Sequence, residues 1–321
     1  MTKVSIMIPT YNQPQYIEQC LQSAMAQDYP ELEIIVSDDS TDGETERIIR
    51  AKYLHDPRIK YFRNEKRLGR VGNYHHTLYE KATGEYVLNL DGDDWFVDNG
   101  YIKEAAGILD RHEDVVCVMA RIIHEHQDTG KREYGAGYEM FHAIDEGNEY
   151  LSALAKRKTP FNHLTALYRR NRALEIGFYN QDTTWTDSES LFRLFCGGRV
   201  GFVNRHVAVW RLHETNESKS FFKHIRFEEL DRNVYTISKY FRQSGCMEGC
   251  RIRKWVFFSL LASLKNVSKQ YIKEKKISEL AATYGFVFRK HKLMGLILIP
   301  TALGSIPGGY VVRKIFRRKA A

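Results

Sequence analysis

Cysteine is scarce in this chain, and its positions are scattered. Five cysteines occur among 321 residues, and no two of them form a Cys-x-x-Cys pair. This spacing predicts neither a disulfide framework nor a zinc knuckle, and it favours a reducing, cytoplasmic setting. The first residues also lack the pattern of a secretory signal peptide, because Met1 to Val4 lead directly into an apolar stretch.

Internal repeats and low-complexity tracts are absent as well. Hydrophobic residues make up 43% of the chain and charged residues 27%, which excludes a disordered protein. The length allows one large α/β domain with an appendage, or two modest domains. A long helical pattern begins near residue 217. The sequence therefore predicts a domain over residues 1–216 and a helical C-terminal region over residues 217–321.

The longest uncharged run lies near the C-terminus, at residues 293–312, in a chain with a net charge of +8. Basic residues flank this run on both sides, and Pro300 and Pro307 oppose one straight helix. Positive charge at both ends also argues against a simple membrane crossing. We interpret the run as a shallow re-entrant or surface-lying hairpin held against anionic lipid, which predicts a peripheral protein on the inner face of the cell membrane. The alternative is a buried hairpin with a solvated basic tail.

Three carboxylates directly follow the apolar residues 86–90. Asp91, Asp93 and Asp94 repel one another at the end of this predicted strand, unless a cation lies between them. Hard divalent cations prefer oxygen ligands and often keep positions open for phosphate oxygens. The pattern therefore predicts a Mn²⁺ or Mg²⁺ site, although an isolated Asp-x-Asp is also typical of a solvated turn.

Short apolar runs alternate with helical spacing over the first 120 residues. The predicted strands are residues 4–8, 33–37, 59–61, 86–90 and 115–119. This alternation predicts a doubly wound, Rossmann-like α/β fold with a mostly parallel sheet. Polar pairs directly follow three of these strands, and ligands bind beyond the carboxyl ends of strands in such sheets.

Five ordered motifs resemble the inverting family 2 glycosyltransferases, which use the nucleotide-sugar-binding fold called GT-A. The motifs are residues 4–12 (VSIMIPTYN), 34–43 (IIVSDDSTDG), 64–73 (NEKRLGRVGN), 82–86 (ATGEY) and 90–94 (LDGDD). Weaker matches follow at residues 185–193 (WTDSESLFR) and 210–213 (WRLH). Two departures are visible: no glycine separates Asp39 from Ser40, and Thr186 precedes Asp187 where the family usually has glutamate.

The resemblance implies a set of residues that bind the nucleotide-sugar. They are Pro9, Thr10, Tyr11, Asn12, Asp38, Asp39, Arg70, Asn73, Asp91 and Gly92. Tyr11 can stack against a base, and Arg70 suits a diphosphate. Asp38 or Asp39 can accept the imide N–H of uracil or thymine, although either acid could instead cap a helix.

The resemblance also implies a metal site and a general base. Asp91, Asp93 and His213 are the expected metal residues, and Asp187 is the expected base that takes the proton from the acceptor hydroxyl. Glu189 is the reserve candidate for the base, and the alternative role for Asp187 is to cap its helix.

The favoured function is transfer of a sugar from a UDP- or dTDP-sugar to a glycan or lipid-linked acceptor, as in bacterial polysaccharide biosynthesis. Two other classes remain open: a sugar-phosphate nucleotidyltransferase and a noncatalytic basic membrane-binding protein. The densest basic cluster flanks an apolar run, so the charge predicts lipid and not nucleic acid as a partner.

Overall fold

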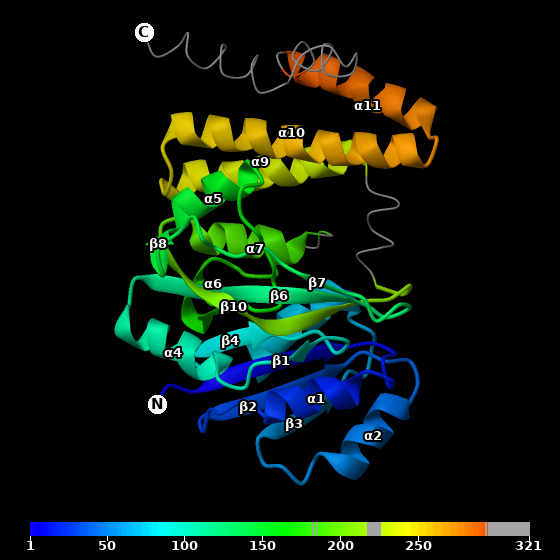
Figure 1. The fold of residues 1–321 in the computed structure, drawn as a ribbon, viewed down its shortest axis with the longest axis vertical. Coiled ribbons are helices and arrows are strands. Elements are labelled where there is room, and N and C mark those ends of the chain that lie inside the picture. Colours follow the sequence, from blue (N-terminus) through cyan, green and yellow to red (C-terminus); the bar gives the residue numbers. More distant parts are fainter. Residues whose placement is uncertain (182, 184, 217–225, 293, 295–321) are drawn as a thin grey trace.

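The computed structural model describes residues 1–181, 183, 185–216, 226–292 and 294. A twisted sheet forms one layer, and helices from the second half of the chain stack above it (Figure 1). The apolar run at residues 293–312 and the basic residues after it lie outside this description, apart from Met294. Within the described part of the chain, no helix is both long enough and apolar enough to cross a membrane.

Strands and helices alternate through the first third of the chain. The elements in order are β1 (Val4–Thr10), α1 (Ile17–Met25), β2 (Leu32–Asp38), α2 (Glu44–Lys52), β3 (Ile59–Arg63), α3 (Gly69–His76), the π-helical turn η1 (Thr77–Lys81), β4 (Tyr86–Asn89), β5 (Trp95–Phe96), α4 (Tyr101–Arg111) and β6 (Val115–His126). Each of the five predicted strands is present. The runs of β1, β2 and β4 are buried on both faces of the sheet, as expected for strands covered by helices on both sides, whereas β3 at the edge is only partly buried.

The second part of the chain adds short strands and long helices. These are β7 (Arg132–Tyr134), β8 (Ile144–Glu146), α5 (Gly147–Ala155), β9 (Leu167–Arg169), α6 (Arg170–Glu175), α7 (Thr186–Phe195), β10 (Arg199–Leu212), α9 (Phe227–Ser244), α10 (Gly249–Lys273) and α11 (Ile277–Lys290). The sheet order is β3-β2-β1-β4-β9-β6-β10-β5, with β7 beside β6 and β8 beside β10.

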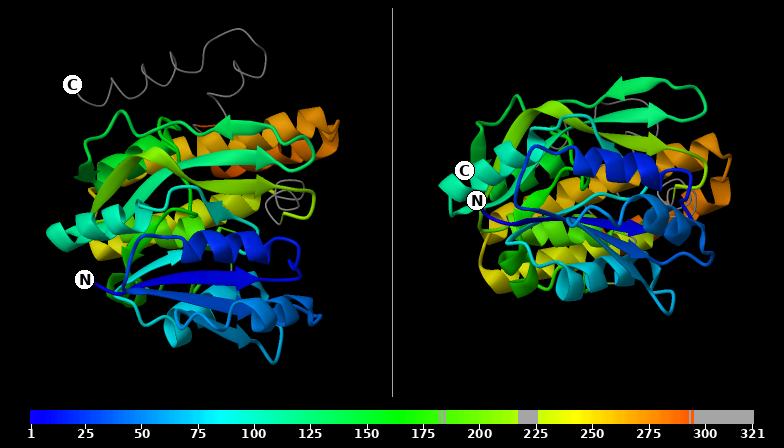
Figure 2. Two further views of the ribbon diagram at one scale, coloured as in Figure 1. Left: turned by 60° about the horizontal axis from the view of Figure 1, so that its bottom comes forward. Right: turned by 90° about the horizontal axis from the view of Figure 1, so that it is seen from below.

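The longest pairings in the sheet are parallel, so the predicted α/β fold with a mostly parallel sheet is confirmed. β1 pairs in parallel with β2 and β4, and the long strands β6 and β10 run side by side in parallel (Figure 2). The sequence did not predict β9, which is antiparallel to both β4 and β6 and joins the two parallel halves. β9 is three residues long, which is too short for an alternation of apolar and polar residues to be recognised.

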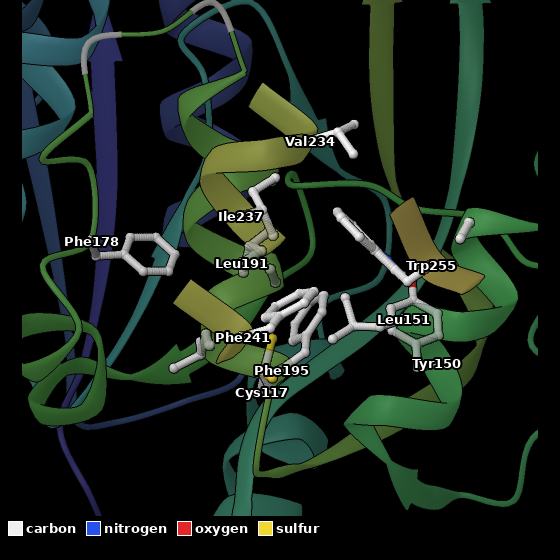
Figure 3. Packing of buried hydrophobic residues seen from close by; sticks show 14 of the residues in the cluster. Cys117, Tyr150, Leu151, Phe178, Leu191, Phe195, Val234, Ile237, Phe241 and Trp255 are labelled. Carbon is white, nitrogen blue, oxygen red and sulfur yellow. The ribbon is translucent and has the colours of Figure 1, made fainter. Parts of the chain in front are cut away.

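Two hydrophobic cores lie on opposite faces of the sheet. Successive side chains of β1 point to opposite faces of the sheet, so Met7 lies in one core, and Ile6 and Ile8 lie in the other. The larger core gathers residues from α5, α7, α9 and α10, including Phe195 and Trp255 (Figure 3). The C-terminal helices therefore share a core with the sheet. The division into domains at residue 216 stays a prediction.

A disulfide joins Cys196, at the end of α7, to Cys246, just before α10. Their Cα atoms are 5.7 Å apart, although 50 residues separate them in the sequence. The sequence predicted no disulfide framework, and it gave no indication of this single bond. Spacing in the sequence could not reveal this pair, because the two cysteines meet through the packing of α9 against both α7 and α10.

Candidate functional site

A cavity of about 930 Å³ opens at the carboxyl ends of β1, β2 and β4. Nine of the residues predicted to act at the site contribute to its lining: Pro9, Thr10, Tyr11, Asp39, Arg70, Asn73, Asp91, Asp93 and Asp187. Six of them lie at the carboxyl ends of parallel strands, which meet at one edge of the sheet, while Arg70 and Asn73 come from α3 and Asp187 comes from α7.

The acid turn, Asp91, Asp93 and Asp94, is a tight loop after β4. A hydrogen bond closes the turn: the N–H of Asp94 donates to the carbonyl of Asp91 at 2.9 Å. Gly92 allows the turn to approach β1, since a Cβ there would lie 2.9 Å from Oγ1 of Thr10. Gly92 therefore shapes the cavity without appearing among its lining residues.

Electrostatics in the acid turn favour a cation. Burial, together with the charge of Asp93, raises the pKa of Asp91 to about 7. Burial and the charges of Asp93 and Asp91 also raise the pKa of Asp94 well above its usual value. Carboxylates that resist ionisation in each other's presence are stabilised as anions by a divalent ion. The donor set of the turn therefore fits Mn²⁺ or Mg²⁺.

His213 lies beside the acid turn, in contact with one of its carboxylates. Its Nε2 is 2.8 Å from Oδ2 of Asp93, and its Nδ1 is 2.8 Å from Oγ1 of Thr215. Among the described residues, no three His, Cys, Asp or Glu side chains form a ready metal cluster. His213 in this arrangement orients Asp93, and it does not line the cavity.

Arg211 is a cation near the acid turn to which the sequence analysis gave no role. Its Nε donates to the carbonyl of Asp93 at 2.9 Å, and its backbone N–H donates to Oδ1 of Asp94 at 2.9 Å. The guanidinium lies between the rings of Tyr16 and Trp95, at 4.7 and 4.3 Å. The motif at residues 210–213 gave a local signal for Arg211. It lies two positions before His213, and residues two apart along an extended chain lie on the same face.

Asp39, directly after β2, holds the loop that carries the basic residues in place. Its carboxylate accepts N–H groups from Leu68 at 2.8 Å and Gly69 at 2.9 Å, and the amide of Asn64 at 3.2 Å. It therefore caps the start of α3 and presents Arg67 and Arg70 to the cavity.

The remaining predicted donor-site residues lie behind the lining or support it. Asp38 is fully buried, and its carboxylate accepts the N–H of Ser40 and the hydroxyl of Tyr61. It is absent from the lining, so Asp39 is the better placed of the two acids. Asn73 donates to the carbonyl of Ser37 at 2.9 Å and ties α3 to β2. Asn12 is also absent from the lining; its side chain bonds Thr41, with a left-handed backbone at φ 52°.

Asp187 and Glu189 occupy different environments on α7. Asp187 lies in the first turn and lines the cavity, and its carboxylate accepts the N–H of its neighbour Ser188 at 2.8 Å. Glu189 is buried and pairs with Arg193, whose Nε is 2.6 Å away. The N-cap of α7 is Trp185, with no side-chain capping bond. Within the described part of the chain, Asp187 is thus neither the cap nor engaged in an ion pair, and Glu189 does not line the cavity.

Aromatic side chains form a further part of the lining that the sequence analysis did not assign. This aromatic wall consists of Phe161, Trp185, Trp210 and His124. His124 and Trp210 are cross-strand partners on β6 and β10, with ring centres 5.3 Å apart. No local pattern identified the wall, because its members come from four separate segments.

Comparisons with known proteins agree with this geometry. Residues 5–178 match the family model described as Glycosyl transferase family 2. A β-1,3-glucosyltransferase from Campylobacter jejuni, named for its action on GalNAc(5)-diNAcBac-PP-undecaprenol, is 26% identical over 243 residues, which cover 74% of this chain and 77% of that protein. The Staphylococcus aureus poly(ribitol-phosphate) β-N-acetylglucosaminyltransferase TarS is 34% identical over 121 residues, which cover 37% of this chain and 21% of that longer protein.

Solved structures show a similar fold. The crystal structure of TarS residues 1–349 with UDP-GlcNAc aligns with a TM-score of 0.70 at 18% identity, covering 99% of this chain and 92% of that one. A mannosyltransferase from Pyrobaculum calidifontis in complex with GDP-Man and Mn²⁺ aligns with a TM-score of 0.56 at 18% identity, covering 94% of this chain and 80% of that one.

Proposed function

We propose, from the premise that this chain belongs to glycosyl transferase family 2, that it moves one sugar from a UDP- or dTDP-sugar to a hydroxyl of a glycan or lipid-linked acceptor. The chain is a glycosyltransferase; the donor, the acceptor and the inversion of the anomeric carbon are the proposal. The observation that supports it most is that one cavity joins the acid turn, the basic residues Arg67 and Arg70, and the carboxylate of Asp187.

Asp39 supports the choice of a uracil or thymine base. A carboxylate offers about four acceptor positions. Three are used, by the N–H groups of Leu68 and Gly69 and the amide of Asn64. The remaining position can accept the imide N–H of uracil or thymine, a donor that cytosine and adenine lack.

Asp187 would act as the general base. Its carboxylate takes the proton from the acceptor hydroxyl, whose oxygen then bonds to the anomeric carbon as the bond from that carbon to the diphosphate breaks. Arg67 and Arg70 would hold the departing diphosphate. Asp91 and Asp93, with His213 orienting Asp93, would hold a divalent cation. When bound, the cation supplies Lewis-acid neutralisation of the leaving group's charge.

The aromatic wall supports a sugar ring as the acceptor. Flat aromatic faces offer apolar contact to one face of a pyranose, while its hydroxyls stay free for polar groups. The name of the C. jejuni relative states an undecaprenol-linked glycan substrate, which has such rings.

The basic residues around the apolar run at 293–312 support attachment to an anionic membrane surface. The full chain should then sediment with phosphatidylglycerol vesicles and not with phosphatidylcholine vesicles. Replacing Arg313, Lys314, Arg317, Arg318 and Lys319 by glutamine should release it. Equal sedimentation of this variant would refute the attachment.

The decisive experiment on donor and metal is a thermal-shift panel of UDP, dTDP, GDP and CDP, with and without Mn²⁺. UDP or dTDP with Mn²⁺ should stabilise the fold by about 2.7 kcal/mol at one hundred times Kd. The double variant Asp91→Ala/Asp93→Ala should lose this effect, whereas Asp128→Asn, at an exposed turn, should keep it. Equal shifts in the double variant would refute the metal site.

The family match favours glycosyl transfer over the nucleotidyltransferase and noncatalytic alternatives. The same panel separates glycosyl transfer from the noncatalytic alternative, because a noncatalytic membrane-binding protein has no reason to select one nucleoside diphosphate. Pyrophosphate release from a nucleoside triphosphate and a sugar phosphate would instead identify a nucleotidyltransferase.

A further inference from the structure

His163 lies at the cavity on a loop that is rigidly attached to β6. The amide of Asn162 donates to the carbonyl of Ala120 at 3.0 Å, and the hydroxyl of Thr165 donates to the same carbonyl at 2.9 Å. The N–H of Ala120 in turn donates to Oγ1 of Thr165 at 3.0 Å. These bonds fix the loop on the central strand, and His163 between the two anchors faces the cavity.

Tyr179 holds one nitrogen of the His163 ring. Its hydroxyl is 2.7 Å from Nε2 of His163. Tyr179 is 1% exposed and has a left-handed backbone at φ 60°, and its N–H donates to Oγ of Ser190 in α7 at 2.9 Å. A large residue keeps such a conformation only where its surroundings over-determine it. The helix that carries Asp187 therefore also sets the position of the hydroxyl that orients His163.

The other nitrogen of His163 is available for a ligand. Burial lowers the pKa of His163; the charge of Asp187 opposes this and the charge of Arg70 adds to it, which favours the neutral imidazole. Where the Tyr179 hydroxyl donates to Nε2, the ring proton lies on Nδ1. Among the described residues, Nδ1 has no hydrogen-bond partner.

The position of His163 relates it to the transferred sugar. His163 lines the same cavity as Asp187 and Arg70, and its ring centre is 5.9 Å from that of Tyr74, whose hydroxyl donates to Oδ1 of Asp91 at 2.7 Å. In an inverting transfer, the sugar lies between the leaving diphosphate, on the side of Arg70, and the base, Asp187. A ring that lines the cavity close to the acid turn is therefore placed toward the sugar and not the nucleoside.

We propose that the Nδ1–H of His163 donates a hydrogen bond to a hydroxyl or acetamido oxygen of the donor's sugar, and so helps the enzyme to select among UDP-sugars. This assignment rests on the proposed function, since it needs a nucleotide-sugar in the cavity. A site built to hydrogen-bond one substituent discriminates against a sugar that does not present it, because the polar group is then left unpaired.

The test compares two affinities in each variant: for UDP, which has no sugar, and for whichever of UDP-GlcNAc, UDP-glucose and UDP-galactose the wild type binds most tightly over UDP. In His163→Ala, Kd for UDP should stay unchanged and Kd for the UDP-sugar should rise about five- to tenfold, the loss of one hydrogen bond. His163→Asn should retain most of the affinity, because its amide nitrogen occupies the place of Nδ1. Tyr179→Phe should weaken UDP-sugar binding less than His163→Ala does.

The matched control is His55→Ala, at an exposed position after α2, which should change neither affinity. Three outcomes would overturn the assignment: equal weakening of UDP and UDP-sugar in His163→Ala, unaltered UDP-sugar binding in that variant, or a wild type whose affinity ignores the sugar. Failure of the wild type to bind UDP at all would instead refute the proposed function, and this assignment with it.

Discussion

The guanidinium carbon of Arg67 lies 4.2 Å from the centre of the Tyr11 ring, at the edge of the cavity. Tyr11 is 37% exposed, so Arg67 and the solvent share its surface in the absence of a ligand. One aromatic ring thus contacts the arginine for which we propose a role at the diphosphate, and keeps exposed surface for the base that we propose to stack on it.

Replacing Tyr11 by alanine should raise Kd for UDP about tenfold, because base stacking and the support of Arg67 are lost together. Tyr11→Phe keeps the ring and should bind UDP almost as the wild type does. Isothermal titration calorimetry measures both values, with Tyr134→Ala, at an exposed strand position, as the control. An unchanged Kd in Tyr11→Ala would show that the base binds elsewhere.

Asp187→Asn should lower the rate of sugar transfer by about 10²- to 10⁴-fold, since an amide cannot take the proton from the acceptor hydroxyl. Its affinity for UDP should survive, because no contact to the nucleotide is removed. The measurement is UDP release from the UDP-sugar that the wild type uses fastest, beside calorimetry with UDP. Substantial turnover in this variant would refute the role of Asp187 as base.

Glu189→Gln should lower the free energy of unfolding. It leaves Arg193 without its buried partner, and breaking such a pair costs about 3–5 kcal/mol of unfolding free energy. Urea denaturation measures this loss. The matched control is Glu175→Gln, which breaks an exposed pair with Arg172 and should change stability by less than about 1 kcal/mol. Similar losses in the two variants would show that the Glu189 pair contributes little.

The contrast between Asp187 and Glu189 shows where sequence reasoning ends. The strands could be predicted because short apolar runs indicate buried strands. The meeting of the three polar clusters could be predicted because parallel strands bring their carboxyl ends to one edge of the sheet. The choice between two acids two positions apart on a helix depends on which face the helix turns to the cavity. That is set by the packing of α7 against α9, α5 and β6, which no pattern around residue 187 describes.

The sequence analysis gave no role to His163, Trp210 and Arg211 for a related reason. Each contacts a partner on another element: Tyr179, His124 and the carbonyl of Asp93. These contacts join residues far apart in the sequence, and only for Arg211 did its place in the motif at residues 210–213 offer a local signal.

Glu33 should make stability depend on pH in the acid range. Burial raises its pKa, but hydrogen bonds from Lys60, Ser5, the N–H of Thr83 and Lys3 outweigh this and bring the pKa to about 2, from a usual value of 4.5. A carboxylate with a lowered folded-state pKa contributes stability above pH 4.5, and this contribution is lost as the pH falls towards 2. Thermal unfolding across this range should show the loss.

The variant Glu33→Gln should be less stable than the wild type at pH 7 by roughly 2–3 kcal/mol, and the difference should shrink between pH 4.5 and 2. Glu31→Gln, at an exposed neighbouring position, is the control and should leave the pH profile unchanged. A constant difference between Glu33→Gln and the wild type over the whole range would contradict the lowered pKa.

The Cys196–Cys246 bond should stabilise the attachment of α10 to α7. Closing a loop across 50 residues restricts the unfolded chain by about 4 kcal/mol in the chain-entropy account. Dithiothreitol should therefore lower the Tm of the wild type, and Cys246→Ser should have that lower Tm with or without reductant. Cys250→Ser removes an exposed free thiol and should respond to reductant as the wild type does. If reductant leaves the wild-type Tm unchanged while mass spectrometry confirms both thiols are free, the bond contributes nothing, and packing between the helices alone holds α10 in place.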